Sequence, residues 1–163
     1  EVVPLRYSTY ARDLQVDLDN MRRDVIRRAR SQAPAEDAAA KPGFTADFAP
    51  VLTALEELRA AGEAADRAAD TAMKSGDAAA AKRINEALTS VEAAFLDAKG
   101  LPNRPWFRHM LIGPGLTTGY APWPFPALQE AVEARDAAMF AREVTRVVTA
   151  IKAGTARLQA AGR

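Results

Sequence analysis

Apolar side chains recur every three or four residues through most of this 163-residue chain, and no useful stretch alternates apolar and polar residues as a strand does. Thirty-seven residues are alanine, the residue with the highest helix propensity. We therefore predict an all-α fold, an antiparallel four-helix bundle in which residues 1–163 form a single domain.

Four segments show the helical spacing, and they span about residues 8–33, 45–74, 78–99 and 126–158. Ser8 or Thr9 is the expected N-cap of the first helix. Gly76 and Asp77 are expected to end the second helix and cap the third. Pro126 is expected to open the last segment, with a break between residues 135 and 138. Residues 35–43, bordered by prolines, are predicted to be a connector.

Composition excludes several classes of function. The formal net charge of +1 is too small to predict nucleic acid as a partner. Without cysteine the chain has no thiol catalysis and no disulfide, although this leaves the compartment open. No apolar run is long enough to span a membrane, and no signal-peptide pattern is present. Because the chain begins at Glu1 rather than methionine, we expect a processed protein or a fragment of a larger one.

Catalysis by this chain alone is not predicted. His109 is the only histidine, and no zinc, nucleophile or nucleotide motif accompanies it, so we expect it to make structural hydrogen bonds. A carboxylate-bridged metal site would need a Glu-x-x-His pair, which the chain lacks. Charged helix faces are usually solvated, and we read the acidic helix residues in that way: Glu56, Glu57, Asp66 and Asp70.

One local basic cluster occurs near the end of the first helical segment, at Arg22, Arg23, Arg27, Arg28 and Arg30. Such a cluster could meet phosphate. Acidic residues at i,i+4 spacing, Asp19 before Arg23 and Asp24 before Arg28, offer it partners within the helix instead. We therefore expect a solvated or partner-facing helix end.

The segment 100–126 holds both tryptophans, the only histidine and six of the ten prolines. Loops of this length in a compact domain are either disordered or functional, and the aromatic content argues against disorder. Trp106 and Phe107 supply two rings that can hold the loop on the bundle, while Arg108 and His109 offer hydrogen-bond donors. Composition leaves a structural strut and a binding surface equally open.

The run Gly100-Leu-Pro-Asn-Arg-Pro-Trp-Phe-Arg-His109, followed by Tyr120-Ala121 and Phe125-Pro126, resembles the C-terminal helical domain of the glutamate carboxypeptidase II family. The transferrin receptor shares this domain, which is called the transferrin-receptor-like dimerisation domain. The start of the chain, Val2 to Leu5 with Tyr10-Ala11, is also similar. The resemblance covers essentially the whole chain.

The resemblance implies a helical domain that joins two copies of a zinc-dependent peptidase. The zinc ligands would belong to a peptidase domain outside this chain, so the chain itself would hold no cofactor and be inert alone. The expected partners are a second copy, the peptidase domain and its peptide substrate, and the expected location is extracytoplasmic. Residues up to His109 would form a structural anchor of the loop: Arg104, Trp106, Phe107, Arg108 and His109.

In the carboxypeptidases that this chain resembles, a Lys-Tyr pair before alanine contacts the C-terminal residue of the substrate. Gly119 and Tyr120 stand at the matching positions, so the tyrosine role carries over and the lysine role does not. We expect weaker selection of C-terminal glutamate in the parent enzyme. Two alternatives stay open: a non-enzymatic parent like the transferrin receptor, and an autonomous adaptor that binds a partner through its alanine-rich second helix.

Overall fold

The computed structural model describes residues 1–31, 44–116 and 122–161, the side chains of residues 28–31 excepted. Within these residues the all-α prediction is confirmed, because five helices account for nearly all regular structure. The helices are α1 (Tyr7–Ser31), α2 (Ala49–Ser75), α3 (Ala78–Ala94), α4 (Pro126–Glu133) and α5 (Ala137–Ala161). A two-stranded antiparallel sheet, β1 (Ile112–Pro114) and β2 (Pro122–Pro124), lies between α3 and α4 and was not predicted.

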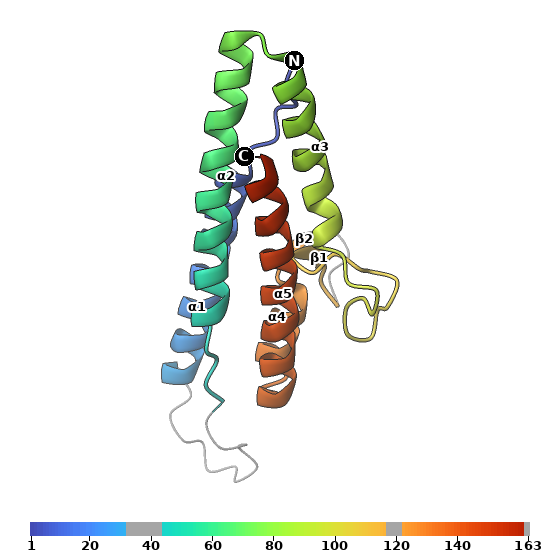
Figure 1. Ribbon diagram of the computed structural model, residues 1–163. Helices are drawn as coiled ribbons and strands as arrows, with labels where there is room; N and C mark the ends of the chain where they lie inside the picture. Colours follow the sequence, from blue (N-terminus) through green and yellow to red (C-terminus); the bar gives the residue numbers. More distant parts are fainter. Residues whose placement is uncertain (32–43, 117–121, 162–163) are drawn as a thin grey trace, which may run out of the picture.

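Helix α5 is central to the packing. It contacts α2, α3 and α4, while α1 packs mainly on α2. In Figure 1, α2 and α3 run side by side in opposite directions, and α5 ends between them. One hydrophobic core joins all five helices to the loop, and its largest fully buried side chains include Phe95, Phe125, Leu55, Leu58 and Met110. No helix among the described residues is long and apolar enough to cross a membrane.

Small residues let α1 and α2 approach closely. Gly62 of α2 is buried, and a Cβ added to it would lie 2.4 Å from the backbone nitrogen of Ser8. Ser8 is therefore a contact residue inside α1 and not its N-cap, because the helix already begins at Tyr7 and the Ser8 hydroxyl donates to Asp66 of α2. The predicted cap at Ser8 or Thr9 was wrong because this tertiary contact was invisible in the sequence.

The turn between α2 and α3 agrees with prediction. Gly76 has φ of 69°, the left-handed conformation that glycine adopts without strain, and follows the last residue of α2. Asp77 caps α3 by accepting a hydrogen bond of 2.9 Å from the backbone nitrogen of Ala80. Pro50 lies in the first turn of α2, where its missing N–H is not needed.

The third helix is shorter than predicted. It ends at Ala94 rather than at Lys99, because the next residues pair with the loop instead of with the preceding turn. Met110 donates a 2.9 Å backbone hydrogen bond to Phe95, and Asp97 donates one of 2.9 Å to Arg108. These long-range bonds replace the helical ones, so helical periodicity alone could not place the end.

The predicted break in the last segment is confirmed. Arg135 has φ of 49° and separates α4 from α5. Asp136 then starts α5 by accepting a 2.9 Å hydrogen bond from the nitrogen of Met139. The predicted connector 35–43 lies outside the described residues.

Candidate functional site

The loop between α3 and α4 is the candidate site, and its described parts are folded tightly onto the helices. Buried apolar side chains hold it from inside, namely Leu101, Met110, Leu111 and Phe125. Strands β1 and β2 pair Ile112 with Pro124 and Pro114 with Pro122. The two ends of the segment that joins the strands therefore lie close together. In Figure 1 the loop bulges away from α3 and α5.

A tight turn shapes the first part of the loop. Gly100 has φ of 65°, and a Cβ there would lie 2.3 Å from the carbonyl oxygen of Pro105, so this position requires glycine. The backbone of Leu101 donates to Phe107 at 2.7 Å, and that of Phe107 donates to Arg104 at 3.0 Å. Asn103 completes the turn with φ of 58°. These bonds fix the segment that carries Trp106.

A buried ion pair ties this turn to α4. Arg104 contacts Glu130 through Nη2 and donates through Nη1 to the carbonyl oxygen of Pro114 on β1. Both charged side chains are almost fully buried. Burial raises the pKa of Glu130, and the charge of Arg104 opposes that rise. The guanidinium Nε of Arg104 is buried, and no described residue forms a hydrogen bond with it. Arg104 thus joins the turn, the hairpin and α4.

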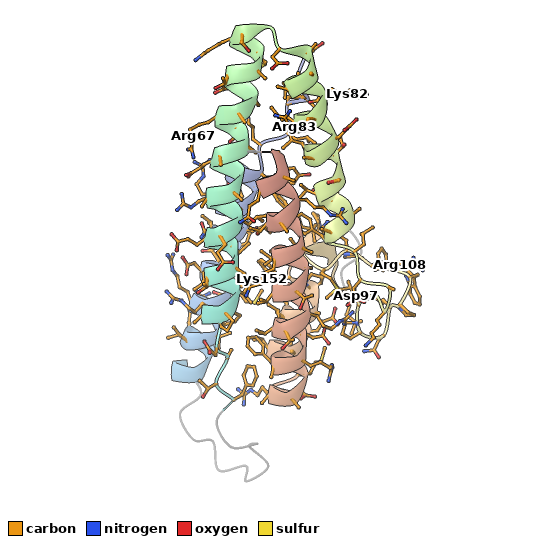
Figure 2. All side chains as sticks on the ribbon, in the orientation of Figure 1. Arg67, Lys82, Arg83, Asp97, Arg108 and Lys152 are labelled. Carbon is orange, nitrogen blue, oxygen red and sulfur yellow. The ribbon has the colours of Figure 1, made fainter. Side chains whose placement is uncertain are left out.

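A second arginine ties the loop to α5. Arg146 donates to Asp97 at 2.9 Å, to the Gly100 carbonyl oxygen at 2.6 Å and to Glu143 at 2.7 Å. Its hydrogen bond lowers the pKa of Asp97. Burial by itself would lower the pKa of Arg146. The neighbouring carboxylates of Asp97 and Glu143 have the larger combined effect, so the pKa is raised. Figure 2 shows Asp97 on the side of the loop that faces α5.

Sequence reasoning missed Glu130, Glu143, Asp97 and Arg146. A signal was present for the two glutamates, because each falls on the buried stripe of its helix. Glu143 lies between Phe140 and Val147 at helical spacing and is 1% exposed. A carboxylate in an apolar stripe indicates a buried partner cation, but which cation it meets depends on the loop path.

His109 makes structural hydrogen bonds in the described structure. Its Nδ1 accepts from the backbone nitrogens of Leu111 at 3.3 Å and Ile112 at 3.1 Å, so the ring hydrogen is assigned to Nε2. Nε2 lies 3.1 Å from a carboxylate oxygen of Glu92 on α3. The ring also packs edge-on against Phe95. His109 therefore joins the loop, the hairpin and α3.

The aromatic rings that we expected to hold the loop lie at its surface instead. Trp106 is 68% exposed and Phe107 is 39% exposed, with their ring centroids 6.3 Å apart. Arg108 is also exposed, and Figure 2 shows it toward the outer edge of the loop. Of the five residues assigned to the loop anchor, only Arg104 is buried, because smaller apolar side chains fill the space under the loop.

The two residues assigned to a substrate pocket, Gly119 and Tyr120, lie outside the described residues. No group of three His, Asp or Glu side chains that could hold a metal occurs in the described ranges.

Part of the basic cluster forms ion pairs within α1. Arg22 lies 3.4 Å from Asp19, and Arg27 contacts Asp24, both at i,i+3 spacing. The predicted pair of Asp24 with Arg28 is not tested. The side chains of Arg28 and Arg30 lie outside the described part of the chain.

Comparison with known proteins shows which family the chain resembles. The profile of the transferrin receptor-like dimerisation domain matches residues 46–159, which include α2, α3, the loop and nearly all of α5. The chain belongs to this family. Its start, including α1, lies before the matched region.

Several relatives carry names that bear on function. A probable glutamate carboxypeptidase of Arabidopsis thaliana is 34% identical over 118 residues, which are 68% of this chain and 17% of that protein. A second one from the same plant is 24% identical over 133 residues, or 82% of this chain and 17% of that protein. An inactive zinc metalloprotease of Schizosaccharomyces pombe is 33% identical over 67 residues, or 41% of this chain and 8% of that protein. The chain thus spans less than a fifth of the length of these relatives.

Proposed function

We propose that this chain, as a single antiparallel helical bundle, joins two copies of a glutamate carboxypeptidase-like, zinc-dependent peptidase. The observation that carries this proposal is the family match over residues 46–159. The family name states dimerisation, and two relatives are named as probable glutamate carboxypeptidases. The chain contributes no catalytic group, and zinc is held by residues of the parent protein, the longer polypeptide to which we assign this chain.

Sedimentation velocity tests the self-association. It is applied to this chain and to the parent protein across micromolar concentrations. We expect the parent protein to sediment as a dimer and to become monomeric when residues 1–163 are deleted. A monomeric parent protein, or a deletion that leaves the dimer intact, would overturn the proposal. The sedimentation of this chain alone then shows how much of the contact it supplies by itself.

The second part of the proposal concerns the loop tip. Tyr120 binds the C-terminal carboxylate of a peptide substrate, and Gly119 removes the ammonium that would pair with a glutamate side chain. This role comes from the resemblance of the motif. The buried pair of Arg104 and the partly buried pair of Arg146 support it, because they tie the base of the same loop to α4 and α5. Loss of a buried charge partner costs on the order of 2–5 kcal/mol, so selection of glutamate should be weak.

Substitution at the tip tests this role. Gly119→Lys in the parent protein should raise kcat/KM for peptides ending in glutamate, relative to peptides ending in leucine, by about tenfold or more. Gly119→Gln is the matched control, because it adds a side chain of similar length without the charge. A steep preference for glutamate in the unaltered protein, or an equal effect of both variants, would contradict the assignment.

A non-enzymatic parent is the second candidate. It is favoured by the relative from Schizosaccharomyces pombe, whose name describes an inactive zinc metalloprotease. The zinc content of the purified parent protein, together with peptide cleavage, decides between the two. Stoichiometric zinc with cleavage supports the peptidase, whereas a dimer that lacks both supports the non-enzymatic alternative.

A further inference from the structure

The hairpin of β1 and β2 has few N–H groups with which to hold itself together. Pro122 and Pro124 in β2 and Pro114 in β1 carry no N–H, and the strands pair at three positions. A two-stranded hairpin is marginally stable in water even with a complete set of hydrogen bonds. This hairpin therefore depends on contacts with the rest of the domain.

His109 supplies such a contact at the point where β1 begins. Its Nδ1 accepts a hydrogen bond of 3.1 Å from the backbone nitrogen of Ile112, the first residue of β1, and one of 3.3 Å from that of Leu111. On the other side of the ring, Nε2 lies 3.1 Å from a carboxylate oxygen of Glu92 on α3. The ring thus connects the start of β1 to α3, and this connection requires an Nδ1 without a hydrogen.

A proton on the ring changes one side of this connection. Histidine changes its charge between about pH 8 and pH 5, and the imidazolium donates from both nitrogens and accepts at neither. The side chain of His109 is 26% exposed, so solvent can deliver the proton. A hydrogen on Nδ1 would point at two N–H groups that can only donate, whereas Nε2 would keep its contact with Glu92 as an ion pair. The proton therefore removes both bonds to the hairpin and strengthens the bond to α3.

The described groups around the ring include one carboxylate, that of Glu92. On α1, Tyr7 lies 3.4 Å from Glu92, and Tyr10 packs against Phe95, the ring that the imidazole contacts. Burial raises the pKa of both tyrosines, to about 12 for Tyr7, so both are neutral where histidine titrates. Arg108 precedes the imidazole in the loop, is exposed and keeps its charge throughout. Glu92 is therefore the charge that would hold the imidazolium on α3.

We propose that His109 makes the attachment of the hairpin to α3 depend on pH: the neutral ring holds the start of β1, and the charged ring releases it. The release is local, because Arg104 stays charged and still donates to the carbonyl oxygen of Pro114 at the other end of β1. The hydrogen bond from Arg146 lowers the pKa of Asp97, so this pair at the base of the loop also persists in mild acid. The inference concerns residues of this chain alone and does not rest on the proposed function.

Nuclear magnetic resonance of the nitrogen-15-labelled chain, from about pH 7.5 to about pH 5, tests this inference. The nitrogen shifts of the ring report the protonation of His109. Hydrogen exchange gives the protection factor of the Ile112 amide, corrected for the intrinsic effect of pH on exchange. Leu101 is the internal control, because its amide donates at 2.7 Å to Phe107 in the same loop rather than to the ring. His109→Asn is the matched variant, since its amide oxygen can accept near the position of Nδ1 but cannot titrate.

We expect the protection factor of Ile112 to fall by about tenfold or more as the ring gains its proton, while that of Leu101 changes by less than about threefold. In His109→Asn the protection of Ile112 should stay within about threefold over the same range. A ring that gains its proton without loss of protection at Ile112 would overturn the inference, as would a ring that stays neutral at about pH 5 or a loss shared equally by Leu101. An equal loss in His109→Asn would overturn it too. The other outcomes are measured on the unaltered chain, so the test does not depend on the folding of the variant.

Discussion

Replacement of Arg146 by methionine tests whether the loop is held by the buried charges or only by its apolar residues. The substitution keeps most of the aliphatic stem and removes the guanidinium. Three acceptors then lose their hydrogen bond from Arg146: Asp97, the Gly100 carbonyl oxygen and Glu143. Arg146 is only 18% exposed and Glu143 only 1%, so water cannot fully replace the lost contacts.

The expected loss follows from this geometry. Removing one partner of a buried ion pair costs about 3–5 kcal/mol. Arg142 still contacts Glu143 at 3.1 Å after the substitution, and Asp97 can be solvated, so we expect a smaller loss of about 2–3 kcal/mol in the free energy of unfolding. For a chain of this length that corresponds to a melting temperature lower by about 4–12 °C.

Arg142→Met is the matched control, because Arg142 lies on the same helix and contacts the same glutamate but is 59% exposed. It should cost at most about 1 kcal/mol. Arg146→Lys should recover part of the stability, since one ammonium cannot serve three acceptors arranged for a guanidinium. Urea unfolding followed by circular dichroism measures all three variants. Equal losses for the two methionine variants would refute the reasoning.

Two further predictions concern the contacts of α1. Gly62→Ala should destabilise the fold by about 1–3 kcal/mol, although alanine favours helix, because the new Cβ would lie 2.4 Å from the nitrogen of Ser8. Thermal unfolding measures the loss, and a stabilised variant would contradict the close approach of α1 to α2. Burial and the nearby charge of Glu92 raise the pKa of Tyr7 to about 12. The native state therefore holds this proton more tightly than the unfolded state, so the associated stability is present below about pH 10 and is lost as the pH rises through the native pKa. Urea unfolding above about pH 10 should depend less on pH in Tyr7→Phe, and an unchanged dependence would argue against the burial of this hydroxyl.

The sequence predicted the helices well where local chemistry decides them. Gly76 and Asp77 end one helix and cap the next through bonds to residues within five positions. The break near Arg135 is likewise local, since Asp136 caps α5 directly. Such signals depend on neighbours along the chain, and these can be read from the sequence.

Predictions failed where contacts between residues far apart in the sequence decide the structure. The end of α3 was placed five residues too late because Phe95 pairs its carbonyl with Met110 of the loop. Trp106 was expected to help hold the loop on the bundle, but Leu101 and Leu111 are buried beneath the loop and Trp106 remains exposed. The hydrophobicity of a side chain predicts that its burial is favourable. It does not predict which of several apolar side chains is buried in the folded structure.

The sequence by itself therefore determined that the chain is helical, where most turns fall, and that residues 100–109 carry a specific family motif. It did so because helix propensity, caps and motifs are properties of short segments. Only the tertiary structure decided that Arg104 and Arg146 join the loop to α4 and α5, and that the loop displays its largest rings outward. Pairings such as Arg104 with Glu130, 26 residues apart, exist only once the helices have packed.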